Sequence, residues 1–102
     1  MLHEINKELF EGMETSFTGV LELYTNSCPV CIQLKPVLEE VANVVENVKF
    51  YTINAQENMS VARKYKVMSV PTTLIIKEGE VVEKILGYKD KEELKNMILK
   101  HF

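Results

Sequence analysis

Two cysteines, Cys28 and Cys31, are the only cysteines in the chain, and Pro29 and Val30 separate them. A C-x-x-C pair can be a redox centre, half of a metal site, or two core residues that happen to be close. A structural zinc site needs four ligands, and the remaining candidates, two histidines, stand near opposite ends of the chain. The pattern therefore favours a redox centre over a zinc site within one chain.

The residues around the pair predict how the two thiols differ. An alternating segment, 19–25, reads as a strand, and an apolar stripe at helical spacing over 28–47 predicts a helix directly after it. Pro29 suits the first helical position, where no backbone donor is needed, and this puts Cys28 at the helix N-terminus. Free N–H groups and the helix dipole stabilise a thiolate there. We expect Cys28 to be exposed and reactive, and Cys31 to lie one turn further inward on the same face.

Such an asymmetric pair suits thiol–disulfide exchange, in which one thiolate attacks a disulfide and the second resolves the mixed disulfide. The elements that must position the pair can be predicted from periodicity, capping and turn signals. The order β-α-β-α-β-α-β-β-α predicts an α/β fold with a parallel core, helices on both faces and an antiparallel hairpin at one edge. Pro36 should bend or offset the helix that carries the cysteines. Besides that helix and the strand before it, the predicted elements are a helix within 6–15, a strand at 48–54, a helix at 58–67, a hairpin of 72–77 and 81–86, and a helix at 90–102.

Length and composition limit the other possibilities. The 102 residues suit a single domain spanning 1–102, and 46% hydrophobic with 26% charged residues is typical of a globular protein. A net charge of −3 gives no electrostatic reason to expect nucleic acid or an anionic membrane as a partner. No apolar run approaches the length of a membrane span, and the first residues have no signal-peptide core. We therefore expect a cytoplasmic monomer without a cofactor, whose Cys28–Cys31 disulfide is transient.

Several further segments resemble the thioredoxin family over essentially the whole chain. The strand "LELY" carries an acid, Glu22, six residues before Cys28, where these proteins typically have aspartate, and Pro36 lies five residues after Cys31. "INAQEN" (53–58), "SVPTTLIIKEGE" (69–80) and Gly87 also match the family's spacing. Each marker is weak alone, but together with the C-x-x-C they are strong. The resemblance implies the thioredoxin fold, with a central mixed sheet of about five strands, and protein-disulfide reductase activity.

The resemblance also assigns roles to individual residues. Cys28 would be the nucleophile and Cys31 the resolving thiol. Pro71 would form a cis peptide facing the disulfide, and the backbone of Val70 would pair with a substrate segment as an added strand. From the sequence alone, a trans-proline at the start of an edge strand fits equally well. The remaining substrate-binding candidates are Ser27, Pro29, Val30, Gly87 and Tyr88, of which the last two would complete an apolar rim.

Glu22 is the acid whose position is most informative. On alternation alone it could face solvent, since it points opposite to the neighbouring leucines. The resemblance instead implies a buried proton acceptor behind Cys31, with its pKa raised by desolvation. A lysine that often neighbours this acid in the family is missing, and Thr52 takes its position. Without a cation nearby, we expect the proton affinity of Glu22 to be higher still.

The chain departs from the family pattern immediately around Cys28. Ser27 stands where thioredoxins usually have tryptophan, and Tyr24 where a second tryptophan is common. Pro29 directly after the nucleophile resembles the Cys-Pro-x-Cys of glutaredoxins. Three hypotheses follow: a thioredoxin-like reductase of protein disulfides, regenerated by a thioredoxin-reductase-like electron donor; a glutathione-dependent thioltransferase; or a non-catalytic binding module, for example two chains sharing a zinc ion or iron–sulfur cluster.

Overall fold

The computed structural model describes all residues 1–102, and its elements follow the predicted order. Most elements are shorter than their predicted ranges by a few residues. The difference is largest for the first helix, predicted within 6–15, and is also clear for the last helix, predicted at 90–102. The elements are β1 (Leu2–Ile5), α1 (Lys7–Glu11), β2 (Gly19–Tyr24), α2 (Pro29–Val44), β3 (Lys49–Asn54), α3 (Met59–Lys64), β4 (Thr72–Lys77), β5 (Glu80–Leu86) and α4 (Lys91–Leu99).

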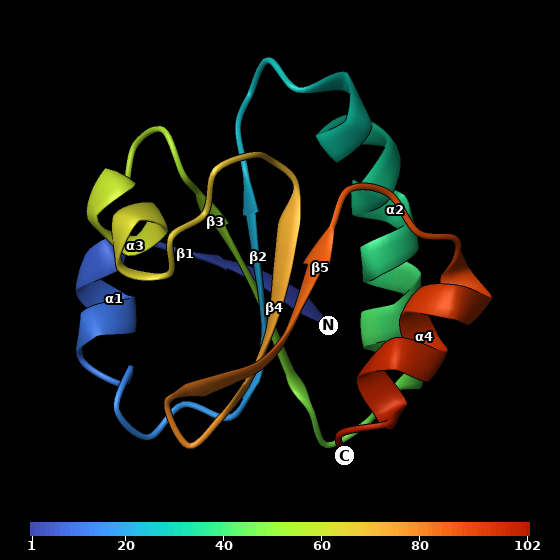
Figure 1. The fold of residues 1–102 in the computed structure, drawn as a ribbon. Helices are drawn as coiled ribbons and strands as arrows, with labels where there is room; N and C mark the ends of the chain where they lie inside the picture. The colour runs from blue at the N-terminus through green and yellow to red at the C-terminus, as the bar shows by residue number, and fades with distance from the viewer.

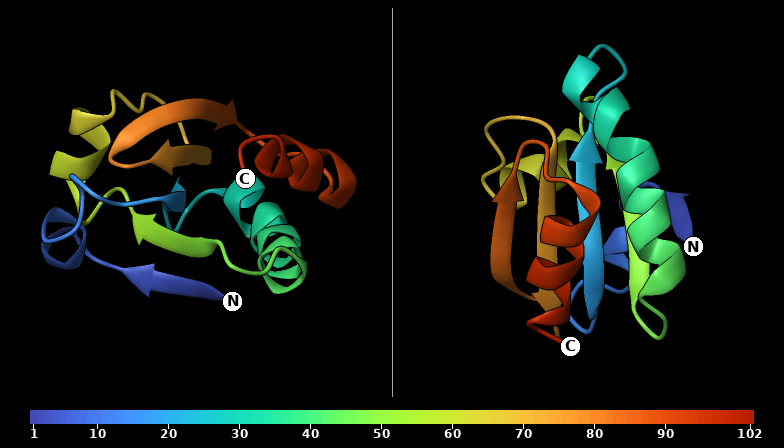
Figure 2. Two further views of the ribbon diagram at one scale, coloured as in Figure 1. Left: turned by 90° about the horizontal axis from the view of Figure 1, so that it is seen from below. Right: turned by 90° about the vertical axis from the view of Figure 1, so that its right-hand side faces the viewer.

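The five strands form one mixed sheet in the order β1-β3-β2-β4-β5. β1, β3 and β2 are parallel, whereas β4 and β5 run antiparallel and form the hairpin at one edge. α1 and α3 cover one face of the sheet, and α2 and α4 lie side by side on the other (Figures 1 and 2). The prediction of an α/β fold with a mixed five-stranded sheet and helices on both faces is confirmed. None of the four helices has the length and apolar composition needed to cross a membrane.

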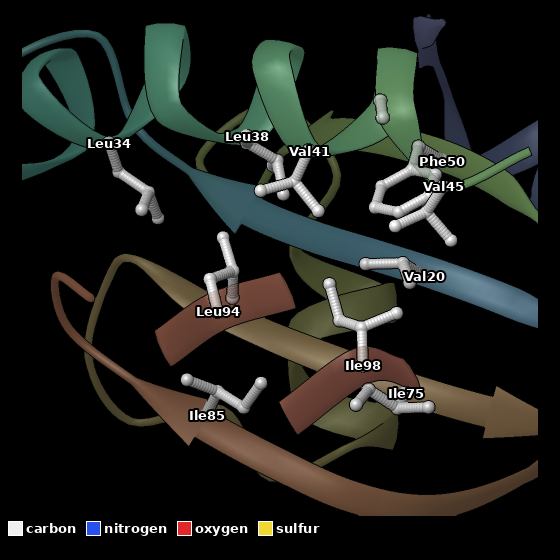
Figure 3. Close-up of a cluster of buried hydrophobic side chains, with 11 residues drawn as sticks. Val20, Leu34, Leu38, Val41, Val45, Phe50, Ile75, Ile85, Leu94 and Ile98 are labelled. Carbon is white, nitrogen blue, oxygen red and sulfur yellow. The ribbon is translucent and has the colours of Figure 1, made fainter. Parts of the chain in front are cut away.

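Alternation along β2 divides the core into two halves. Leu21 and Leu23 belong to the cluster between the sheet and α1 with α3, whereas Val20 belongs to the cluster on the opposite face. In that second cluster Leu38 from α2 and Leu94 from α4 are fully buried against the sheet (Figure 3). Glu22 has the parity of Val20, so its side chain is directed to the face that α2 covers.

α2 is anchored at the end that carries the cysteines. Cys28 is its N-cap, and Pro29 occupies the first helical position, as predicted. The helix continues through Pro36 and ends at Val44, so the proline does not divide it into two helices. Its predicted extension to residue 47 is wrong, because Val45 is in an extended conformation and Asn47 has a φ of 68°.

One end of the sheet collects the segments that matter for chemistry. The β2–α2 loop, the segment before β4 and the β5–α4 connection all lie at the upper end in Figure 1. Gly87 N–H donates to the Pro71 carbonyl at 2.9 Å, and Ala55 N–H donates to the Tyr24 carbonyl at 2.8 Å. These backbone hydrogen bonds fix the connections to one another, so the side chains that they carry have defined positions.

Candidate active site

The two cysteines form a disulfide at the N-terminus of α2, with their Cα atoms 5.2 Å apart. Cys28 is extended, with φ −115° and ψ 102°, and its sulfur accepts a hydrogen bond from the Cys31 N–H at 3.1 Å. A sulfur in this capping position receives one of the free backbone donors of the first turn. The geometry therefore favours negative charge on Cys28 when the pair is reduced.

The exposure of Cys28 differs from our prediction. Cys28 is only 9% exposed and Cys31 4%. In this disulfide-bonded state, the Cys28 sulfur is joined to Cys31 and lies 3.7 Å from the Val70 carbonyl oxygen. The two cysteines therefore differ little in exposure, contrary to the prediction. They differ mainly in position, because Cys28 is the N-cap of α2 and Cys31 lies within its first turn.

The segment opposite the disulfide has the predicted conformation. The Val70–Pro71 peptide bond is cis, and the Val70 carbonyl faces Cys28. The Thr72 hydroxyl donates to the Ser69 carbonyl at 2.7 Å, and the Pro71 carbonyl accepts from Gly87 N–H. Pro71 is buried, whereas Val70 is half-buried, so part of the backbone beside Cys28 lies close to the surface.

Glu22 is buried, at 4% exposure, on the same face of the sheet as α2. Its carboxylate accepts a hydrogen bond from the Thr52 hydroxyl on the adjacent strand β3. Burial raises the pKa of Glu22 to about 7, although the Thr52 hydrogen bond and the charge of Lys35 oppose the increase. The predictions that Glu22 is buried and that its pKa is raised are confirmed.

A pocket of about 170 Å³ connects Glu22 with the inner side of the disulfide. Cys31 and Glu22 both line it, so the second cysteine and the buried acid border one cavity. Tyr24 stands at this pocket, and its hydroxyl donates to the Glu4 carboxylate. The full lining is Glu4, Glu22, Tyr24, Thr25, Asn26, Cys31, Ile32, Lys35 and Thr52.

One expectation about the charges around Glu22 is wrong. We expected no cation there, because Thr52 replaces the lysine of the family pattern. Lys35, from the second turn of α2, lines the same pocket and lowers the pKa of Glu22. The sequence does contain a signal for this contact, since Lys35 follows Cys31 by four residues and so lies on the same helical face.

The remaining predicted residues lie in the β2–α2 loop, in the first turn of α2 and in the connection between β5 and α4. Ser27 and Pro29 are exposed, Val30 is 40% exposed and Tyr88 46%. Gly87 has a φ of 77°, which favours glycine, and it leads the chain from β5 toward α4. The structure thus brings the rim candidates to the end of the sheet that holds the cysteines.

Besides Lys35, sequence reasoning missed two residues near this end. Met68 is 93% exposed, three residues before Pro71, and adds apolar surface to the segment before β4. Thr73 pairs with Glu22 in the β2–β4 register, and its buried hydroxyl has no hydrogen-bond partner in the protein. Neither position differs in type from an ordinary loop or strand residue, so the sequence alone gave no reason to select them.

Comparison with known proteins agrees with this geometry. The thioredoxin family model matches residues 3–100. The chain is 42% identical over 102 residues to a thioredoxin of Listeria monocytogenes. It is 36% identical over 101 residues to a thioredoxin of Chlamydia pneumoniae. Each alignment covers 99% of this chain and 99% of the relative. Among solved structures, it superimposes on a thioredoxin from Nicotiana alata with a TM-score of 0.88 at 26% identity, covering 98% of this chain and 91% of that one. The chain belongs to the thioredoxin family.

Proposed function

We propose that this thiol–disulfide oxidoreductase reduces disulfides of other proteins, with Cys28 as the attacking thiolate and Cys31 as the resolving thiol. The observation that carries this assignment is the capping geometry, in which the Cys31 N–H donates to the Cys28 sulfur at 3.1 Å. Cys31 lies within the first turn and lines the pocket that holds Glu22, whereas Cys28 is the N-cap and does not line that pocket. The two thiols are therefore in different electrostatic environments, as sequential attack and resolution require.

The reaction proceeds in two exchanges. The Cys28 thiolate attacks one sulfur of the substrate disulfide, forms a mixed disulfide and releases one substrate thiolate. Cys31 then loses its proton and attacks the Cys28 sulfur, which forms the Cys28–Cys31 disulfide and releases the second substrate thiolate. The substrate gains two electrons and the cysteine pair loses two, so a dithiol donor must reduce the pair before the next cycle.

Glu22 is the proposed acceptor of the Cys31 proton. Both groups line the same pocket, and a pKa of about 7 leaves Glu22 about half ionised at neutral pH. A carboxylate with an ordinary pKa near 4.5 would be ionised but a far weaker base. The proton passes to Glu22 directly or through water in the pocket.

The substrate would bind across the cis-proline segment. Val70 presents backbone polar groups beside Cys28, and an extended substrate segment can pair with them like an added strand. Val30 and Tyr88 offer exposed apolar side chains, and Ser27 in the loop and Pro29 at the start of α2 are also exposed. We expect Tyr88→Ala to raise KM for a protein disulfide while leaving the rate with a small, readily reduced disulfide such as 5,5′-dithiobis(2-nitrobenzoic acid) unchanged.

The proposed partners are protein disulfides and a thioredoxin-reductase-like electron donor, as in the family to which the chain belongs. The proposed location is the cytoplasm, where such a pair can cycle between dithiol and disulfide.

Reduction of insulin tests this function directly. The wild-type protein should reduce insulin with NADPH and a bacterial thioredoxin reductase, and Cys28→Ser should abolish turnover. The same assay with glutathione and glutathione reductase is the comparison. Turnover with glutathione alone, and none with the reductase, would contradict the proposal and favour a thioltransferase.

Glu22→Gln tests the proton acceptor. Pre-formed mixed disulfide should resolve more slowly in this variant, and the dependence of the rate on pH near 7 should disappear. Glu39→Gln, which changes an exposed carboxylate on the same helix as the cysteines, is the matched control. If Glu22→Gln keeps the wild-type rate and pH profile, Glu22 is not the acceptor.

A further inference from the structure

Lys35 is the lysine that lines the pocket of the buried acid. It projects from α2 one turn beyond Cys31 and lines the pocket that holds Glu22 and Cys31. It forms none of the ion pairs of the structure, which engage Lys64, Lys91, Lys95, Lys100 and His101. Its ammonium is therefore not neutralised by a carboxylate partner of its own.

Glu4 carries the opposite charge at the same pocket. It comes from β1, opposite Thr52 in the β1–β3 register, and its carboxylate accepts the Tyr24 hydroxyl. The negative charge of Glu4 raises the pKa of Glu22, whereas the positive charge of Lys35 lowers it. The pocket of the buried acid is thus lined by one further charge of each sign, Glu4 and Lys35.

The groups packed around Glu22 leave few other sources of charge. From β1 there is Glu4, from β2 Tyr24, and from α2 Lys35 and Cys31. The neighbours in register on β3 and β4 are threonines, which do not titrate. Lys35 is therefore the one cation that lines the pocket of Glu22.

We propose that Lys35 is a positioning residue, whose positive charge acts across the pocket to set how readily Glu22 accepts the Cys31 proton, and that Glu4 opposes it. This inference rests on the proposed role of Glu22 in resolution. The basis is geometric: Lys35, Glu22 and Cys31 line one pocket, and Lys35 comes from the same helix as Cys31. Lys35 keeps Glu22 ionised in a larger fraction of molecules at neutral pH, so more of them are ready to take the proton.

Titration of the Glu22 carboxyl by carbon-13 NMR tests the proposal, with Glu22→Gln used to assign the resonance. Lys35→Gln should raise the Glu22 pKa by about half a unit, roughly a threefold change in the ratio of ionised to protonated acid, because one unit is tenfold. Lys35→Arg should retain the wild-type midpoint, since it keeps the charge. Glu4→Gln should lower the midpoint, and its amide oxygen can still accept the Tyr24 hydroxyl.

Matched variants separate this local effect from a general change in protein charge. Lys7→Gln and Glu8→Gln remove the same charges from α1, on the opposite face of the sheet, and should leave the midpoint in place. At about 1 M salt, where the Debye length is about 3 Å, the difference between wild type and Lys35→Gln should shrink. The pH midpoint of mixed-disulfide resolution should follow the Glu22 pKa in each variant.

A Glu22 midpoint that moves no more in Lys35→Gln than in Lys7→Gln would overturn the role of Lys35. This result is distinct from failure of the Glu22 assignment. If the Glu22 assignment alone failed, the pKa of Glu22 would still respond to Lys35→Gln. The Glu22→Gln variant, however, would resolve the mixed disulfide at the wild-type rate, and the pH dependence of resolution would not follow the titration of Glu22.

Discussion

Replacement of Glu22 by glutamine should change how the stability of the oxidised protein depends on pH. The pKa of Glu22 is about 7 in the folded protein and about 4.5 when the group is in water. The folded state therefore holds the Glu22 proton more tightly than the unfolded state. The resulting stabilisation is complete below about pH 4.5 and is lost as the pH rises through about 7.

The size of the effect follows from these two values. One pKa unit corresponds to about 1.4 kcal/mol, so the wild-type protein should lose roughly 2–3 kcal/mol of unfolding free energy between about pH 5 and pH 8 through Glu22 alone. Glu22→Gln cannot ionise and lacks this loss. Relative to wild type, the variant should become more stable by roughly 2–3 kcal/mol over that interval.

Urea denaturation at several pH values measures this difference, with the unfolding free energy obtained by linear extrapolation. The disulfide must stay intact, so no reductant is added. Glu39→Gln is the control and should follow the wild-type pH dependence, because that carboxylate is exposed. If the stabilities of wild type and Glu22→Gln run parallel from pH 5 to pH 8, Glu22 does not titrate there and the account of a desolvated proton acceptor is wrong.

Three further substitutions have expected outcomes. Thr52→Val removes the hydroxyl that donates to Glu22 and should raise the pKa of that acid above about 7. Carboxyl NMR measures this pKa, and an unchanged value would contradict the expected effect of the hydrogen bond. Leu38→Ala should lower the unfolding free energy by about 2–5 kcal/mol, because the side chain is fully buried; a loss below 1 kcal/mol in urea would contradict the core packing. Gly79→Ala should destabilise the protein more than Gly12→Ala. Gly79 has a φ of 83° and an added Cβ would lie 2.7 Å from a backbone oxygen, whereas Gly12 has a helical φ and its Cβ would meet nothing closer than 3.6 Å. Equal thermal unfolding midpoints of the two variants would contradict this prediction.

The fold could be predicted largely from local signals. The alternation of the β2 residues, the apolar stripe of α2 and the glycine turn between β4 and β5 each reported the element that the structure contains. Periodicity extends past the true helix ends, however, since apolar residues continue along the chain where the backbone already turns away. This is why the range 28–47 overran a helix that ends at Val44.

The candidate site was predictable where chemistry depends on sequence neighbours and less so where it depends on packing. Cys28, Pro29 and Cys31 are adjacent in the chain, so their place in the helix cap follows from capping rules. Alternation alone left Glu22 equally open to solvent or to burial, and only the family resemblance indicated a buried acid. The spacing of Lys35 from Cys31 indicates a shared helical face, but the approach of Lys35 to Glu22 depends on the pocket that residues of α2 and the sheet line together.

Trapping of the mixed disulfide tests the central claim most directly. When Cys31→Ser is incubated with insulin, the account predicts that a covalent complex accumulates through Cys28, identified by mass spectrometry of non-reduced peptides, and that multiple turnover stops. Cys28→Ser should form no such complex under the same conditions. Sustained insulin reduction by Cys31→Ser, or a complex formed through Cys31 in the Cys28→Ser variant at a comparable rate, would contradict the assignment of the attacking and resolving thiols.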